Sequence, residues 1–416
     1  MNRREFLSSA LCAGAAMLLP GCGTRRASGK TALTYNTFWT GRDAHGTAMQ
    51  WIYKEFRKRH PEIDLQVVES AGGAMDNGQK LMAELAAGGG PDVIHDTTYD
   101  HVRCNYLLDL TDHIAPWRDR FDPEALASCT WNGRVISLPT EYSMVPCIWN
   151  LRLLRKVGKD VPTTFDEYMD VGRALKKKGI PIMCMSQSGG HVFLSVLFGH
   201  PNIVELIANE EWEADPFLHA VEVLKEIRDA GFLPDNDIEL RWGDAASLFQ
   251  NDRMGYYMNG AWTLINEITA VGVDPELRNN VAFTPFPAID GRRPIRGWVA
   301  TKSALNSTLA EEPDKLKGAV AFYELFTSHE SAIRFVSMAH SPQGVKLDWD
   351  ESLSGKLLYD FFNSRSQATG VFVIPNKPGF FSEQTQNRAL PDIMAALSEG
   401  MSAKKALAYF AEVLRA

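Results

Sequence analysis

The chain has 416 residues, of which 45% are hydrophobic and 23% are charged. This is the composition of a globular protein, and the length suffices for two or three domains of about 150 residues each. Lys and Arg number 43 against 51 Asp and Glu, so the net charge of -8 argues against attraction to a polyanion, and no nucleic-acid partner is expected. Beyond the N-terminal segment, no apolar run is long enough to span a bilayer, which excludes a polytopic membrane protein.

Residues 1–21 have the pattern of an export signal, because charged residues precede an apolar run from Ser8 to Leu19. The pair Arg3-Arg4 looks like the twin-arginine signature, although general export is the alternative route. The following Leu-Pro-Gly-Cys, ending at Cys22, resembles a bacterial lipobox, from which Pro20 departs. We predict an exported protein, periplasmic or on the cell surface, anchored by a lipid on Cys22 and followed by a linker over 22–30.

The body of the chain begins with alternating strand and helix patterns. An extended run at 31–37 predicts a strand, and apolar residues at helical spacing from Met49 to Phe56 predict a helix. A second strand is predicted at 63–68, a second helix at 79–87 and, after a glycine-rich turn, a third strand at 92–95. Such alternation indicates an α/β protein with a mainly parallel sheet, whose ligands bind beyond the carboxyl ends of the strands.

The elements further along the chain are predicted by caps and apolar spacing. Thr164 and Glu167 form a capping box for a helix that ends near Gly179. The remaining predicted elements are a helix through 217–227, strands at 253–258, 281–285 and 297–301, and helices at 315–327 and 403–414, the last with Ser402 as N-cap.

The cysteines and histidines indicate no metal or cofactor. Cys104, Cys129, Cys147 and Cys184 form no CxxC pair, and three full disulfide pairings or buried free thiols all remain possible. His95 and His101 lie near one predicted strand end without a third ligand at a defined spacing. Motifs of hydrolases, zinc proteases and nucleotide-binding loops are missing, and the glycines at 88–90 follow a helix rather than opening one. The sequence therefore does not support an enzyme.

Four local patterns resemble one known family. They are 56–65 together with Pro-Asp-Val-Ile at 91–94, the stretch GRVISLPTEYSMVPCIWN at 133–150, the helix start at 162–167, and FQNDRMGYYMNGAW at 249–262. The segments 284–287 and 297–298 add to the resemblance. These patterns resemble the extracellular solute-binding proteins of bacterial ABC importers, in the carbohydrate-binding group that includes maltose-binding protein.

The resemblance implies a periplasmic-binding-protein fold with two lobes, each a sandwich of sheet and helices, and a ligand cleft between them. Lobe 1 would comprise 31–142 and about 295–345, and lobe 2 would comprise 143–294 and about 346–416. The resemblance also implies a monomer that closes on its solute and delivers it to the importer's membrane subunits without chemistry.

A sugar presents polar rims and apolar C–H faces, so its site combines aromatic rings with hydrogen-bonding groups. The candidate aromatic residues follow predicted strands or turns: Trp39, Trp149, Trp262 and Trp298, the last preceded by Gly297. The polar candidates are Asp96, Tyr99, Glu141, Tyr142 and Asn259 and, from their loop positions alone, Asp43 and Arg365. Core packing is the alternative role for each tryptophan, and turn capping for each polar residue.

The sequence thus predicts a sugar-binding lipoprotein of an ABC importer, with an oligosaccharide as its solute. A secreted carbohydrate-active enzyme is one alternative, because it would also place aromatic residues and carboxylates in a cleft. A binding protein for a polyamine, iron or a phosphate ester is another, although no cluster of acidic residues or of arginines indicates such a charged solute. The particular sugar is not determined by the sequence.

Overall fold

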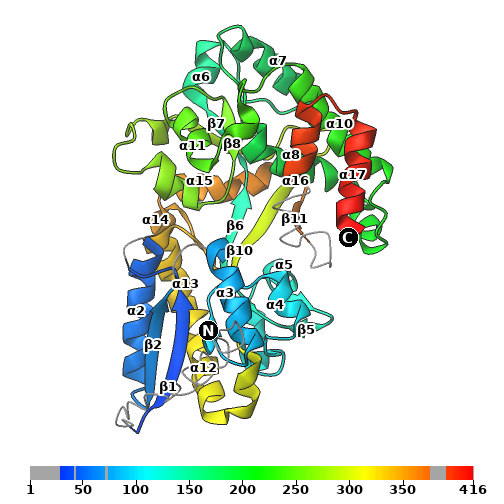
Figure 1. Cartoon of the computed structure of the whole chain (residues 1–416). Helices are drawn as coiled ribbons and strands as arrows, with labels where there is room; N and C mark the ends of the chain where they lie inside the picture. Colours follow the sequence, from blue (N-terminus) through cyan, green and yellow to red (C-terminus); the bar gives the residue numbers. More distant parts are fainter. Residues whose placement is uncertain (1–28, 42–43, 71–73, 375–389, 416) are drawn as a thin grey trace, which may run out of the picture.

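A sheet of mainly parallel strands organises the lower lobe in Figure 1. The computed structural model describes residues 29–41, 44–70, 74–374 and 390–415. Strand β1 (Thr31–Thr37) alternates buried and more exposed residues and pairs in parallel with β2 (Ile63–Glu69) and β3 (Val93–Ile94). The strand order is β11 (Val371–Val373), β10 (Ile295–Leu305), β3, β1 and β2, with β10 antiparallel to β3.

Helices cover this sheet and close the lower apolar core, which includes Leu33, Tyr35, Phe322 and Phe326. The main helices are α2 (Ala44–Arg59), α3 (Ala74–Ala86), α4 (Tyr99–Arg103), α5 (Pro123–Ala127), α12 (Pro313–Phe326) and α13 (His329–Arg334). The smaller elements are η1 (Ala115–Arg120), η5 (Ser307–Glu311), η6 (Phe335–Ala339) and the hairpin β4 (Thr130–Trp131) and β5 (Arg134–Val135).

The upper lobe contains an antiparallel sheet in the order β8 (Tyr256–Met258), β7 (Cys147–Asn150) and β9 (Val281–Thr284). Its helices are α6 (Leu151–Lys156), α7 (Phe165–Lys176), α8 (Met185–Leu197), α9 (Ile203–Ala208), α10 (Asp215–Asp229), α11 (Trp242–Gln250), α15 (Lys356–Asn363), α16 (Leu390–Ser398) and α17 (Ala403–Arg415). Short helical turns are η2 (Asp237–Glu239), η3 (Leu264–Ile268), η4 (Leu277–Asn279) and η7 (Ser364–Gln367). The upper core includes Trp149, Tyr168, Phe217 and Phe410, so the last helix packs into this lobe.

Two long strands join the lobes (Figure 1). β6 (Leu138–Val145) and β10 (Ile295–Leu305) pair in an antiparallel ribbon, which we call the hinge ribbon. The lower end of β10 pairs with β3, and its upper end pairs in parallel with β11 (Val371–Val373). A third connection runs through residues 340–350 to α14 (Glu351–Ser354), which lies beside the waist in Figure 1.

The predicted α/β class and the two lobes are confirmed, and several predicted elements match the structure closely. The first strand has the predicted bounds, and the Thr164–Glu167 capping box is present. The predicted strand at 297–301 is longer and spans 295–305, because it pairs with β6 along its middle, with β11 at its start and with β3 at its end. The predicted strand at 253–258 begins only at Tyr256, since Asp252 has a φ of 54° and turns the chain. All four cysteines of the body are free thiols.

Some predicted features lie outside the described residues. These are the export signal, the Arg3-Arg4 pair, Cys22 and the candidate ligand residue Asp43. Among the described residues, no helix is long and apolar enough to cross a membrane. In the same part of the chain, no group of three or more His, Cys, Asp or Glu side chains could hold a metal ion.

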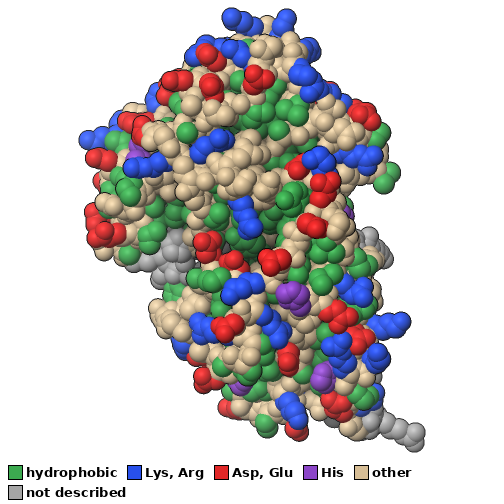
Figure 2. Space-filling view, turned by 180° about the vertical axis from the view of Figure 1, so that it is seen from behind, with side chains coloured by type: hydrophobic (Ala, Val, Ile, Leu, Met, Phe, Trp, Pro, Cys, Tyr) green, Lys and Arg blue, Asp and Glu red, His purple; other side chains and the backbone are tan. Residues whose placement is uncertain are grey.

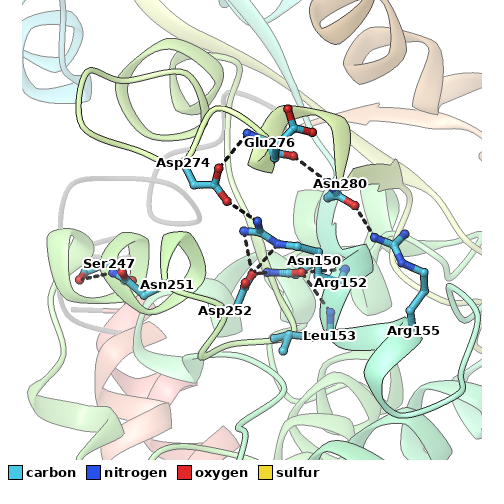
Figure 3. A network of polar contacts seen from close by, with 10 residues as sticks. All are labelled: Asn150, Arg152, Leu153, Arg155, Ser247, Asn251, Asp252, Asp274, Glu276 and Asn280. Carbon is cyan, nitrogen blue, oxygen red and sulfur yellow. Dashed lines mark hydrogen bonds and ion pairs between the residues drawn. The ribbon is translucent and has the colours of Figure 1, made fainter.

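A polar network fixes the edge of the upper sheet (Figure 3). Asn150 caps α6, because its Oδ1 accepts from the backbone N–H groups of Arg152 at 3.0 Å and Leu153 at 3.2 Å. Its Nδ2 donates to Asp252 at 2.6 Å, and the Nε of Arg152 donates to the same carboxylate at 3.0 Å. Arg152 also bonds Asp274. Asn150 and Asp252, both in the motifs that carry the family resemblance, therefore have a structural role here.

Asp252→Ala should lower the free energy of unfolding by about 1–3 kcal/mol, because it leaves the buried Asn150 amide without its acceptor. Alanine is also disfavoured at the positive φ of this position, which Asp tolerates. Urea unfolding monitored by fluorescence measures the change. Asp252→Asn is the matched control, since it keeps an acceptor oxygen and tolerates the same backbone conformation. An unchanged midpoint for Asp252→Ala would show that the network does not stabilise the lobe.

Candidate ligand-binding site

The hinge ribbon presents different side chains on its two faces, because successive residues of a strand point in opposite directions. Its front face carries Glu141 and Ser143 of β6 with Arg296 and Trp298 of β10, and Ser143 lies directly opposite Trp298. Its back face carries Tyr142, Met144, Gly297 and Val299 and packs against an apolar cluster of the waist. The register of β6 and β10 thus decides which residues share a face.

Two tryptophans meet at the front face. Trp262 follows β8 in a turn whose Ala261 N–H donates to the Ser143 hydroxyl at 2.8 Å, so the turn is tied to the ribbon. The Trp262 and Trp298 rings have centroids 5.2 Å apart and planes at 75°. Both side chains are partly exposed. They are therefore aromatic surface held in place by two different segments of the upper half of the protein.

Gly260 and Asn259 shape the turn before Trp262. A Cβ at position 260 would lie only 2.1 Å from the Trp262 ring, so the ring can occupy its place only because this residue is glycine. Asn259 is buried, and its Oδ1 accepts from the Gly260 N–H at 2.8 Å. Its Nδ2 has no hydrogen-bond partner within the described part of the chain. That amide is a spare donor next to the aromatic pair.

Glu141 lies at the lower end of the front face and is 6% exposed. Its Oε1 accepts from the Ser341 hydroxyl at 2.5 Å and lies 3.1 Å from the Nε2 of His45. Burial raises the pKa of this carboxyl, but the hydrogen bond and charge of His45, with the Ser341 bond, outweigh burial and hold the pKa below its usual value. Glu141 is therefore ionised at neutral pH.

Asp96 follows β3 and lies near Glu141. Its Oδ1 accepts from the backbone N–H groups of Thr97 at 3.0 Å and Lys302 at 3.2 Å, so it joins the end of β3 to β10. Burial raises the pKa of Asp96 to about 7, and the charge of Glu141 acts in the same direction. Two carboxyl groups that are far apart in sequence thus lie on the lower-lobe side of the ribbon.

The molecular surface narrows and is hollowed at the waist, where acidic and basic side chains gather between the lobes (Figure 2). Aromatic rings reach the ribbon from above and carboxyl groups from below. This combination can stack a flat apolar ring face while binding hydroxyl groups at its rim. Such an arrangement suits a polar organic solute held between two lobes.

Comparison of the sequence with models of known protein families agrees with the geometry of this site. The model of the bacterial extracellular solute-binding proteins matches residues 41–333. The chain belongs to this family. The resemblance predicted from the sequence motifs is therefore confirmed. Since the family is extracellular, this solute-binding protein is exported, and the family is one of binding proteins rather than enzymes.

Individual relatives share less than a third of their aligned residues with this chain. An arabinooligosaccharide-binding protein of Bacillus subtilis is 28% identical over 296 residues, and the match spans 65% of this chain and 65% of that protein. The melibiose/raffinose/stachyose-binding protein MelE of the same organism is 22% identical, over 79% of this chain and 78% of its own length. A solved structure of a chitin oligosaccharide binding protein has a TM-score of 0.78 at 18% identity, covering 93% of this chain and 98% of that one.

The structure does not place Trp149, a predicted ligand residue of this solute-binding protein, on the front face of the hinge ribbon. It is 0% exposed in the upper core, where its ring lies 4.4 Å from that of Tyr256. Its Nε1 donates to the Thr284 hydroxyl at 3.0 Å. The central position of β7 in its sheet buries this side chain, so it offers no surface to a solute.

The structure places Trp39, another predicted ligand residue, beneath the ring of His45 rather than at the surface. The His45 ring stacks on it at 4.7 Å with planes 15° apart, and Phe335 lies 5.4 Å away. Trp39 therefore supports His45, which in turn bonds Glu141. The sequence prediction missed His45, although its place soon after the first strand is where ligands of parallel sheets bind.

Three further predicted residues lie behind the ribbon rather than in front of it. Tyr142 is mostly buried, and its hydroxyl lies 2.4 Å from where a Cβ of residue 297 would be, so Gly297 makes room for Tyr142. Arg365 is exposed in η7. Burial raises the pKa of Tyr142, and the positive charge of Arg365 partly offsets this, which places Arg365 near Tyr142. Of the remaining candidate, Tyr99, only the backbone at the start of α4 is described.

Asp96→Asn should change how stability depends on pH. The pKa of Asp96 is about 7 in the folded protein and about 3.9 in an unfolded chain, so the folded state binds the proton more tightly. The stability that this difference in pKa contributes is fully present below about pH 4 and is lost as the pH rises through about 7. We therefore expect the parent protein to lose unfolding free energy relative to Asp96→Asn between about pH 5 and about pH 8. Urea unfolding at both pH values measures this difference, and equal changes in the two proteins would contradict it.

Proposed function

We propose that this solute-binding protein captures a sugar, most simply an oligosaccharide, between its lobes and delivers it to the membrane subunits of an ABC importer. The observation that carries the proposal is the partly exposed Trp262–Trp298 pair on the same ribbon face as Glu141. Indole rings stack on the apolar faces of sugar rings, and carboxylates accept hydrogen bonds from hydroxyl groups. The relatives named above, which are an arabinooligosaccharide-binding protein, a melibiose/raffinose/stachyose-binding protein and a chitin oligosaccharide binding protein, support a sugar as the solute.

The proposed contact residues come from both lobes. Trp262, Trp298 and Asn259 contribute from the upper side, and Asp96 and Glu141 from the lower side. Asp43 and Tyr99 stay candidates on sequence grounds. The lobe boundaries stay those proposed from the sequence, 31–142 with about 295–345 and 143–294 with about 346–416; Trp298, near the start of the second segment of lobe 1, packs against the upper core.

Closure of the lobes follows from this arrangement of contacts. A solute that touches both lobes favours the closed form, because some of its contacts exist only in that form. The two strands of the hinge ribbon and the connection through 340–350 are the segments that bend. Small-angle scattering should show a smaller radius of gyration with bound sugar, and an unchanged radius would contradict closure.

The N-terminal sequence supports a lipid anchor. After export, by the twin-arginine or the general route, Cys22 would become the lipid-bearing first residue of a monomeric protein held at the membrane surface. Intact-mass analysis of protein from the native export pathway tests this, because a diacylglycerol group adds a defined mass. An unmodified N-terminus would refute the anchor without touching the sugar proposal.

A thermal-unfolding screen tests the function directly. The protein without its export signal is heated with arabinotriose, raffinose, chitotriose, maltotriose and single sugars. A sugar present at about 1,000 times its Kd should stabilise the folded state by about 4 kcal/mol and raise the Tm by several degrees. Chromatography of the recovered sugar then separates binding from hydrolysis. If no sugar raises the Tm, a non-sugar solute is favoured. If a sugar is broken down, a carbohydrate-active enzyme is favoured.

A further inference from the structure

A buried arginine lies against one of the two site tryptophans. Arg296 is 5% exposed and precedes Trp298 by two residues in β10, so both side chains point to the front face of the hinge ribbon. The guanidinium carbon lies 4.5 Å from the centroid of the Trp298 ring. This is the geometry of a cation–π contact, and a planar guanidinium can also stack on an indole. Arg296 thus restrains the plane of Trp298.

His191 of α8 holds this arginine. The Nη1 of Arg296 lies 3.1 Å from the Nδ1 of His191. Arginine only donates, so Nδ1 is the acceptor and the ring proton is on Nε2. Burial, with the charge of Arg296, lowers the pKa of His191 to about 3, which keeps the ring neutral and able to accept. A helix of the upper lobe thereby fixes a side chain of the ribbon.

The orientation of Trp298 in turn affects Trp262, because the two rings meet at 5.2 Å with planes at 75°. A partly exposed indole that is free to rotate must be ordered when a solute stacks on it, and this ordering weakens binding. A site whose rings are already held by neighbouring side chains avoids that loss. The chain from His191 through Arg296 and Trp298 to Trp262 provides such support.

We propose that Arg296 and His191 are positioning residues for solute recognition, which hold the Trp262–Trp298 pair in the one orientation that accepts a sugar ring. This inference rests on the proposed function, because it assumes that these rings bind a sugar. Arg296 and His191 would then contribute to solute binding through Trp298 rather than by contacting the solute.

The test replaces Arg296 by methionine. Arg296→Met should weaken the binding of whichever of arabinotriose, raffinose or chitotriose the parent protein binds by about ten-fold, as measured by calorimetry. The Tm of the unliganded variant should fall only slightly, because an apolar side chain of similar length can replace a buried charge at little cost in stability. The exciton couplet of the Trp262–Trp298 pair in circular dichroism should also diminish, and this readout needs no sugar.

Matched variants complete the design. Arg334 makes a similar contact in the lower lobe, with its guanidinium carbon 4.1 Å from the Trp51 ring, so Arg334→Met should change neither the affinity nor the couplet. Arg296→Lys keeps the cation without the planar group and should give intermediate values. His191→Asn keeps an acceptor near the position of Nδ1 and should bind more tightly than His191→Ala.

The outcomes separate this inference from the proposed function. If Arg296→Met retains both the affinity and the couplet, the positioning role is wrong whether or not a sugar binds. If Arg334→Met reproduces the effects of Arg296→Met, a general loss of packing explains them, and the positioning role is again wrong. If the parent protein binds none of the sugars, the proposed function fails, and the couplet alone decides whether Arg296 orients the tryptophans.

Discussion

Replacing Trp262 by alanine should weaken sugar binding by about 100-fold while leaving the unliganded protein folded. The ring is partly exposed, packs over Gly260 and meets Trp298 edge to face, so its removal takes away binding surface rather than core. Calorimetry with the sugar found in the thermal screen measures the affinity, and the Tm of the unliganded variant measures its stability. Retained affinity in the folded variant would remove Trp262 from the proposed site.

Two companion variants sharpen this test. Gly260→Ala leaves the indole in the protein but places a Cβ 2.1 Å from its ring, so it should also lose affinity by displacing the ring. Trp51→Ala removes a tryptophan that is likewise partly exposed but lies in the lower lobe against Arg334, and it should bind sugar as the parent does. An equal loss in Trp51→Ala would show that removing any tryptophan disturbs binding.

Replacing Trp149 by alanine should lower stability rather than affinity. We expect a loss of about 3–5 kcal/mol in the free energy of unfolding and no specific loss of sugar affinity. The ring is 0% exposed in the upper core, and its truncation leaves a large cavity. It also leaves the Thr284 hydroxyl without the indole N–H that it accepts. Urea unfolding measures the stability, and calorimetry at a temperature where the variant is folded measures the affinity.

Trp149→Phe is the matched control for this second prediction. It retains an aromatic ring of somewhat smaller volume but lacks the N–H, so it should lose less stability than Trp149→Ala. A variant with unchanged stability and lost affinity would show that Trp149 contacts the solute after all, and would restore the prediction made from the sequence.

The predictions that matched best concern helices and strands whose formation depends on nearby residues in the sequence. β1 has its predicted bounds because it is a short extended run in which buried and more exposed residues alternate. The helix after Thr164 begins where predicted because the Thr164 side chain and Glu167 satisfy each other's backbone groups within one turn. The positive φ angles of Gly179 and Gly231 likewise lie just beyond the ends of predicted helices. Each of these signals depends on residues only a few positions apart.

The features that the sequence did not reveal concern residues whose surroundings depend on distant neighbours. Trp149 and Trp298 both lie in strands, and only the packing around each strand decides that the first ring is covered and the second is partly exposed. Arg296 could have been noticed as a charge beside the apolar residues at the start of this strand, two residues before a candidate tryptophan. Nothing in the sequence connects it with His191, which lies 105 positions away.

The sequence alone predicted the α/β class, the family and the helices and strands with strong local signals, because these follow from short-range patterns of apolar residues, caps and turns. It also indicated Trp262, Trp298 and Glu141 as candidates for the site. The three-dimensional structure shows that Glu141 and Trp298 share the front face of the hinge ribbon, where Trp262 meets Trp298, while Tyr142 and Gly297 lie behind it. Strand register explains this arrangement, because neighbouring residues of a strand point to opposite faces and the pairing of β6 with β10 determines which side chains meet.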